Sequence, residues 1–176
     1  DIDITPEQVL RIALQTARNQ ERFSPEIIRR LRQVNLVISD PWTDELRELF
    51  IDLLLVGHDA IPVFETLDQL DLFVPLLPEW KPARSRPQRN AYHRFTVDRH
   101  LLETAAEASK LADRVDRPDL LVIGALLHDI GKPYPGDHTE VGVQLINSIA
   151  GRMGFPKADI EIPVSYTHLT LPTIAI

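Results

Sequence analysis

Residues 119–142, DLLVIGALLHDIGKPYPGDHTEVG, decide the fold that we predict for this chain. The first half of this stretch is apolar on nearly every side, which is typical of a helix in the middle of a hydrophobic core. The helix ends on His128-Asp129, and a core tolerates a histidine and an aspartate poorly. The same dipeptide occurs at His58-Asp59, so the pair of residues alone does not indicate a function.

The composition is that of a protein with a sizeable core, because 44% of the 176 residues are hydrophobic. This length allows one domain of ordinary size or two small helical ones. The chain has no cysteine, which excludes disulfides and thiolate zinc sites and favours a reducing compartment, the cytoplasm. A net charge of -7 argues against nucleic acid as a partner. We find no signal peptide and no apolar run long enough for a membrane span, so no membrane partner is expected.

Helix starts are well marked along the chain. Thr5-Pro6 and Ser24-Pro25 each combine an N-cap hydroxyl with a proline at the first helical position. Asp137, with Glu140 three residues later, has the pattern of a capping box. The predicted helices cover residues 5 to about 18, 24 to about 34, 43–57, 63–70, 96–115, 118–131 and 137 to about 153. Because no strand pattern is convincing before residue 164, we predict an all-α fold.

These helices fall into two groups. The first is a small bundle at 1–80, and the basic, proline-rich segment 81–89 is typical of an exposed connector. The second group occupies 90–163. The segment 164–176, VSYTHLTLPTIAI, leaves the helical pattern and is rich in threonine and β-branched residues, so we expect it to be a non-native tail. Because the chain opens at Asp1 without a methionine, we expect a fragment of a longer protein.

Four of the six histidines belong to the second group: His93, His100, His128 and His138. His93 and His100 are two helical turns apart and share a face if their helix starts early enough. His128 and Asp129 stand at a helix end, where both can reach one point beyond that end. A divalent ion at this point would accept an imidazole and a carboxylate together. Such an ion would also make the buried charge tolerable.

A simpler interpretation exists for each of these residues. A lone buried histidine is more often a hydrogen-bonded core residue than a ligand, and we assign such a structural role to His58-Asp59, which has no histidine nearby. Asp129 could likewise be satisfied by backbone N–H groups at a turn. For the set of His100, His128 and Asp129, with His138 beyond, the spacing favours a metal site.

The motifs around these residues resemble those of a known family. LLHDIGK at 126–132 and GDH at 136–138, with a histidine upstream, resemble the HD superfamily of metal-dependent phosphohydrolases. More narrowly, NAYHRFTVDRHLLETAAEA and the stretch that follows it to about residue 162 resemble the uridylyl-removing domain of bifunctional PII uridylyltransferase/uridylyl-removing enzymes. Residues 5–80, with LLPEW at 76–80, resemble less specifically the helical region that joins the nucleotidyltransferase and HD domains of that family.

The resemblance implies an activity and a cofactor. In that family the HD domain hydrolyses the phosphodiester between UMP and a tyrosine of the PII signalling protein, and the metal is Mn²⁺ or Mg²⁺. Carried over by motif, His100 matches the first histidine of the signature, and His128 and Asp129 match its His-Asp pair, as metal ligands with catalytic roles. His138 would be a further metal ligand or a phosphate contact. Lys132 would contact a phosphate oxygen in catalysis, or else face solvent at the helix end.

The chain also departs from the family pattern. The HD signature ends with an aspartate on a later helix, and the predicted tail begins before that point. Asp159 lies too close to the preceding helix to be a confident replacement. We therefore expect a helical linker region at 1–80 followed by a truncated HD-type helical domain at 90–163 that lacks one metal ligand and is inactive on its own. The nucleotidyltransferase motifs and the ACT sensor domains of the family are absent from this sequence.

Two other functions stay open at this point. Another HD-type nucleotide phosphohydrolase, such as the domain of CCA-adding enzymes or guanosine tetraphosphate hydrolases, would share the HD pair and the upstream histidine but not YHRFTVDRH. A non-catalytic helical docking domain would suit the acidic composition and the missing ligand. Metal binding separates this docking function from the two enzymatic ones.

Overall fold

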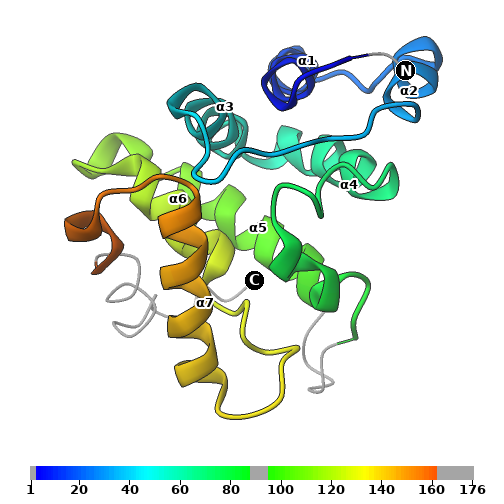
Figure 1. Ribbon diagram of the computed structural model, residues 1–176. Helices are drawn as coiled ribbons and strands as arrows, with labels where there is room; N and C mark the ends of the chain where they lie inside the picture. The colour runs from blue at the N-terminus through cyan, green and yellow to red at the C-terminus, as the bar shows by residue number, and fades with distance from the viewer. Residues whose placement is uncertain (1–2, 88–94, 162–176) are drawn as a thin grey trace.

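The computed structural model describes residues 3–87 and 95–161, which are organised as a set of packed helices (Figure 1). The main α-helices are α1 (Pro6–Arg18), α2 (Pro25–Leu31), α3 (Asp44–Leu55), α4 (Ile61–Gln69), α5 (Val97–Ser109), α6 (Pro118–Leu127) and α7 (His138–Arg152). Short 3-10 helices are η1 (Gly57–Ala60), η2 (Pro78–Ala83) and η3 (Ala112–Arg114). No strand occurs in the described residues, which confirms the predicted all-α fold. His93 and the predicted tail at 164–176 lie outside these residues.

Side-chain caps start the helices where the sequence predicts. The hydroxyls of Thr5, Ser24 and Thr43 each accept a hydrogen bond from a backbone N–H three residues later. At the start of α7 the carboxylate of Asp137 accepts hydrogen bonds from the backbone N–H groups of the second and third helical residues. These caps satisfy N–H groups that have no partner inside the helix.

Three predicted helices are shorter than the sequence indicates. α6 ends at Leu127 instead of residue 131, and hydrogen bonds between residues three apart follow it. α2 ends at Leu31 instead of about residue 34, in a turn of hydrogen bonds between residues three apart. The helix predicted over 96–115 divides into α5 and η3. The division follows Ser109, whose hydroxyl donates to the carbonyl oxygen of Ala106 and so competes with the helical hydrogen-bond ladder.

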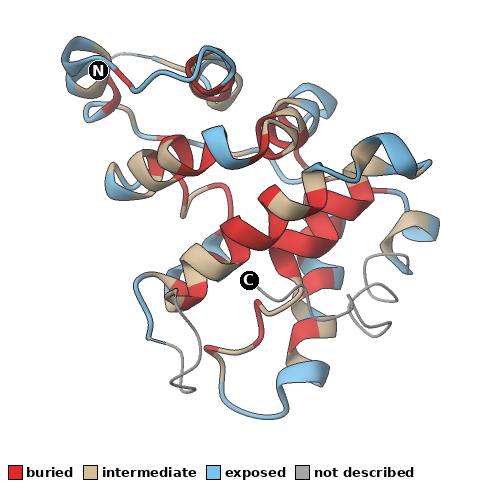
Figure 2. Ribbon diagram, turned by 180° about the vertical axis from the view of Figure 1, so that it is seen from behind, coloured by how far each residue is buried: buried red, intermediate tan, exposed pale blue. Residues whose placement is uncertain are grey.

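One hydrophobic core joins the two helical groups. α5 packs along α6, α1 packs along α3, and α3 contacts both α5 and α6. Every residue of α6 from Leu120 to Leu127 is buried, and the buried residues gather in the central helices (Figure 2). This burial explains why α6 is apolar on nearly every side. None of the helices in the described ranges is long and apolar enough to cross a membrane.

The segment predicted as an exposed connector, 81–89, is partly packed against the protein. Its first residues continue η2, where Trp80 and Ala83 are buried. Arg84 donates hydrogen bonds to a carboxylate oxygen and the carbonyl oxygen of Asp68 in α4. Of the remaining residues, 85–87 are exposed and 88–89 lie outside the described ranges. The start of this segment is therefore anchored on the first helical group, through Arg84 as well as through the chain.

Candidate metal centre

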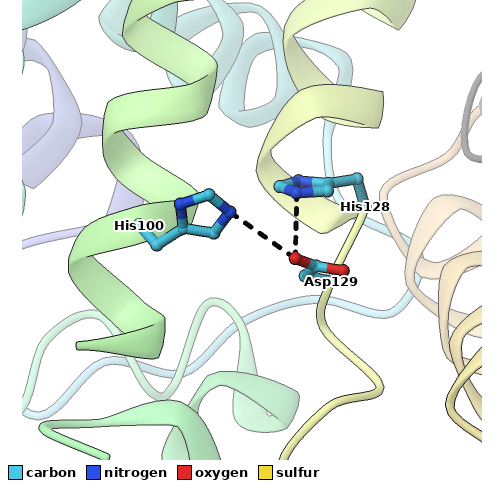
Figure 3. Close-up of side chains that lie close together, drawn as sticks. All are labelled: His100, His128 and Asp129. Carbon is cyan, nitrogen blue, oxygen red and sulfur yellow. Dashed lines mark ion pairs between the residues drawn. The ribbon is translucent and has the colours of Figure 1, made fainter. Parts of the chain in front are cut away.

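Two packed helices bring the predicted ligands together. His100 lies in the first turn of α5, and His128 is the residue at which α6 ends. Because the start of α5 lies beside the end of α6, the centroids of the two imidazole rings are 5.2 Å apart. Asp129 follows His128 in the chain, and its carboxylate faces both rings (Figure 3).

One carboxylate oxygen is the meeting point of these side chains. Oδ2 of Asp129 lies 3.1 Å from Nε2 of His128 and 3.5 Å from Nε2 of His100. Each of the three residues offers one ligand atom such that all three atoms lie within 4.8 Å of one another. Elsewhere in residues 3–87 and 95–161 no group of three or more potential ligands meets this condition. The three side chains are only 19–23% exposed, which limits their solvation by water.

These separations suit a shared metal ion. Nitrogen and oxygen ligands at about 2.0–2.2 Å from one ion lie about 2.8–3.6 Å from each other in octahedral or tetrahedral arrangements. The two measured distances, 3.1 Å and 3.5 Å, fall within that range. Imidazole nitrogens and a carboxylate oxygen also form a donor set that divalent transition metals accept. The residues present therefore fit the divalent ion that the sequence predicts.

A backbone contact fixes the orientation of the His128 ring. Nδ1 of His128 lies 2.7 Å from the carbonyl oxygen of Ala125, one turn earlier in α6. Because a carbonyl oxygen can only accept, this contact places the hydrogen on Nδ1. Nε2 faces Asp129: when the ring is protonated it carries a hydrogen that Asp129 accepts, and when the ring is neutral it carries a lone pair that a metal ion can accept. Metal-binding histidines are commonly oriented in this way by a hydrogen bond to the other ring nitrogen.

Asp129 is held as a carboxylate by its surroundings. Burial acts to raise the pKa of Asp129, but hydrogen bonds from His100 and His128, the charge of His128 and a hydrogen bond from Lys132 outweigh it and bring the pKa well below its usual range. Nζ of Lys132 lies 2.6 Å from Oδ2, the same oxygen that faces the two histidines. Lys132 therefore points toward the predicted metal site, and a metal ion would share this oxygen with its ammonium group.

The N-terminal end of α7 forms the opposite wall of the site. A cavity of about 140 Å³ is lined by His128, Asp129 and Lys132 on one side and by the start of α7, including His138 and Thr139, on the other. His138 is exposed and does not belong to the close group of three ligands. The structure thus brings His100, His128 and Asp129 into ligand distance and places His138 farther along the same cavity.

Gly131 allows α7 to approach this closely. A Cβ atom on Gly131 would lie 2.6 Å from the carbonyl oxygen of His138 and 2.8 Å from the backbone nitrogen of Gly142. Both distances are shorter than real Cβ contacts, and both neighbours are backbone atoms that cannot turn aside. A side chain at this position would therefore push the start of α7 away from Asp129.

The second His-Asp pair forms a different arrangement. Nε2 of His58 lies 3.1 Å from a carboxylate oxygen of Glu103 and 3.1 Å from one of Glu107, both on α5. Asp59 accepts a hydrogen bond from the side-chain amide of Gln20 in the loop after α1. The two side chains of this pair thus bind different partners, in line with the structural role assigned to them from sequence.

Asp159 takes part in a salt bridge instead of the metal centre. Its carboxylate lies 2.9 Å from the guanidinium of Arg117, which also binds Asp119 at the start of α6. Asp159 is absent from the one group of potential ligands found in the described residues.

Two contributors to the site were not singled out from sequence. Thr139 lines the cavity, and its position one residue after His138 in a capped first turn was the available signal. The carbonyl oxygen of Ala125 orients His128. Its position three residues before a histidine on the same helix face could have suggested this contact, although any residue there would supply a carbonyl group.

The described residues are all helical, and a histidine on α5 faces a His-Asp pair at the end of α6. This combination of fold and site indicates the class of protein to which the chain belongs. The HD domain family matches residues 97–171, a range that starts with α5 and contains all four predicted ligands. This part of the chain belongs to the HD domain family, whose members are metal-dependent hydrolases. The match extends into the segment 164–176, whose origin as a non-native tail stays a prediction.

The chain as a whole is similar to a more specific group of bacterial proteins. It is 45% identical over 157 residues to the bifunctional uridylyltransferase/uridylyl-removing enzyme of Streptomyces coelicolor, covering 89% of this chain and 19% of that protein. The enzymes of the same name from Mycobacterium tuberculosis H37Rv and Corynebacterium glutamicum are 38% and 34% identical, over 97% and 69% of this chain. The chain spans about a fifth of the length of these curated relatives. The chain therefore belongs to the family of bifunctional uridylyltransferase/uridylyl-removing enzymes, and its residues 97–171 are the part that matches the HD domain.

Proposed function

We propose that this chain supplies the metal centre that removes UMP from the uridylylated PII signalling protein, with Mn²⁺ or Mg²⁺ as cofactor. The observation that carries the proposal is the group of His100, His128 and Asp129 inside the range matched by the HD domain family. The reaction is suggested by the name of the relatives, which includes uridylyl removal. Cleavage of the phosphodiester by water would release UMP and leave the tyrosine hydroxyl of PII.

Each ligand has a distinct part in this proposal. A divalent ion at the site would lower the pKa of a water molecule and offset negative charge on the phosphoryl group. His128 keeps Nε2 available because its Nδ1–H is directed to Ala125. Asp129 stays ionised over the physiological pH range, since its pKa is well below the usual value. His100 contributes the donor from the neighbouring helix.

Lys132 and the start of α7 are suited to hold the phosphate. Lys132 lines the cavity beside Asp129 and carries a charge that a phosphate oxygen would neutralise. His138 and Thr139 are the first two residues of α7, where the helix dipole favours an anion. An anionic phosphodiester in this cavity would thus lie between the lysine ammonium and the positive end of a helix.

The test is UMP release from uridylylated PII by the whole protein that contains this chain. His128→Ala should lower the rate by more than the roughly 10–100-fold that loss of a supporting contact around a metal site costs. Uridylyl transfer by the same preparation should stay close to that of the wild type, which controls for folding. His58→Ala is the matched control within the chain and should leave UMP release unchanged. Normal UMP release by the His128 variant would show that the site has been assigned wrongly.

A further inference from the structure

Glu79 belongs to the LLPEW motif at 76–80, and no residue of this motif is among the candidate metal ligands. It lies in η2, and its side chain is only 13% exposed. The two carboxylate oxygens of Glu79 each accept a hydrogen bond of 2.7 Å from a different nitrogen of the Arg152 guanidinium. Such bidentate pairs are strong and fix the relative orientation of both groups. Because Arg152 is the last residue of α7, η2 holds the C-terminal end of the helix whose other end lines the metal site.

The same segment also holds the loop that leads from the metal centre to α7. The carbonyl oxygen of Glu79 accepts a hydrogen bond of 3.2 Å from the hydroxyl of Tyr134. Nη1 of Arg86, just beyond η2, donates to the carbonyl oxygen of Pro133 at 3.0 Å. Both contacts fall within four residues of Lys132, which is in contact with Asp129. The loop therefore has anchors on η2 as well as on the helices that carry the ligands.

These contacts differ from the other ion pair of this region. Arg84, also next to η2, pairs with Asp68 and Asp71 around the end of α4. None of its hydrogen bonds reaches the loop after Asp129 or α7. The two arginine–carboxylate pairs are comparable in distance, at 2.7–3.1 Å. Of these two pairs, only that of Glu79 reaches α7 and the loop after Asp129.

We propose that Glu79 is a positioning residue for the metal centre. Through Arg152 and Tyr134 it sets the position of α7 and of the loop that carries Lys132, and thereby the fit of Asp129 to the ion. The helices before residue 81 are then part of the support of the site, in addition to being a connecting region. This inference rests on the proposed metal-dependent function.

The test compares Glu79→Gln with Arg84→Gln in the whole protein. Calorimetry measures the Mn²⁺ binding that His128→Ala removes, and thermal melting measures stability. Glutamine at 79 keeps the size and the main-chain contact with Tyr134 but loses the charged bidentate pair, so the variant should fold. We expect it to weaken Mn²⁺ binding by roughly tenfold, the lower range for supporting contacts around a metal. Arg84→Gln should lower the melting temperature to a similar extent and leave Mn²⁺ binding unchanged.

Exchanging the two charges provides a second test. Glu79→Arg combined with Arg152→Glu restores a bidentate pair with the opposite polarity, and it should recover most of the Mn²⁺ affinity lost in either single variant. Equal losses of Mn²⁺ affinity in the Glu79 and Arg84 variants would overturn the inference, because they would reflect stability alone. If the wild type has no Mn²⁺ binding that depends on His128, the proposed function itself fails, which is a separate result.

Discussion

His128-Asp129 and His58-Asp59 are the same two residues in two different surroundings. At 128–129 the dipeptide ends a fully buried helix, and a third donor, His100, reaches it from the neighbouring helix. At 58–59 the dipeptide sits in the short helix η1, and its two side chains bind separate partners. The dipeptide alone therefore does not define a candidate metal centre, which also needs the donor that the fold brings to it.

The charges around the two pairs differ as well. His58 faces two carboxylates, Glu103 and Glu107, which already interact with Arg99 and Lys110. His128 faces one carboxylate that it shares with another histidine and a lysine. A carboxylate that faces imidazole nitrogens from two different helices is arranged to share an ion with them, in competition with the ammonium group of Lys132. The His58 cluster is arranged to neutralise charge across the surface of α5.

The largest effect should come from removing the carboxylate of each pair. Asp129→Asn should lower UMP release by the whole protein by at least about 100-fold, because it removes the charge of a metal ligand. Asp59→Asn should leave the rate within about twofold of wild type, since an amide oxygen can still accept the hydrogen bond from Gln20. The rate of UMP release from modified PII measures both. Comparable losses in the two variants would erase the distinction between the two dipeptides.

A smaller effect is expected at Gly131, two residues after Asp129. Gly131→Ala should cost about 1–3 kcal/mol of unfolding free energy, as overpacking does, because the new methyl group meets the backbone of α7. It should also weaken Mn²⁺ binding. Gly151→Ala is the matched control, since it lies inside α7 with open space around it. That variant should be neutral or more stable by up to about 1 kcal/mol. Urea denaturation provides the comparison, and equal stabilities would argue against close packing at Gly131.

Lys132 should affect metal binding and turnover in opposite directions. Lys132→Gln removes a positive charge 2.6 Å from the metal-facing oxygen of Asp129, so Mn²⁺ should bind roughly tenfold more tightly. UMP release should nevertheless fall, because the phosphate loses a cationic partner. Lys110→Gln, which removes the other lysine paired at i,i+3 with a carboxylate, should change neither quantity. Weaker Mn²⁺ binding by the Lys132 variant would mean that this lysine supports the ligand instead of competing for it.

The smallest effect is expected in the His58 cluster. The hydrogen bond from Lys110 is the main cause that lowers the pKa of Glu107; burial opposes it, and the charges of Lys110 and His58 add to it. A lowered pKa in the folded state gives stability above the unfolded pKa of about 4.3, which is lost as the pH falls through the folded value. Glu107→Gln should therefore cost up to about 1 kcal/mol at pH 7 and less near pH 3. Urea denaturation at both values measures this, and a cost that persists undiminished at low pH would exclude an ionic cause.

Much of this architecture follows from local sequence patterns. Thr5, Ser24 and Thr43 mark helix starts because a hydroxyl cap acts on residues of its own turn. The unbroken apolar run of α6 predicts burial for the same local reason. The division of the predicted 96–115 helix was missed, since the side-chain contact of Ser109 with a backbone carbonyl competes with helix propensity in a way that the apolar spacing does not show.

The grouping of the candidate ligands could be predicted from the sequence, and the contacts around them could not. His100, His128 and Asp129 could be proposed because histidine and aspartate at a buried helix end need a reason to be there. The contacts of Glu79 with Arg152 and Tyr134 join residues 73 and 55 positions apart, and no periodic pattern encodes a pair at such a separation. The contact of η2 with α5 could not be predicted for the same reason, and the prolines and arginines of this segment are typical of an exposed connector.

The most direct test of the metal centre is pulsed electron paramagnetic resonance of the protein loaded with Mn²⁺. Coupling of the bound ion to ¹⁴N reports imidazole ligands without reference to activity. We predict coupling to the nitrogens of both His100 and His128, reduced when either is changed to alanine and unaffected by His58→Ala. Mn²⁺ bound without nitrogen coupling, or with coupling that survives the loss of both His100 and His128, would contradict the account.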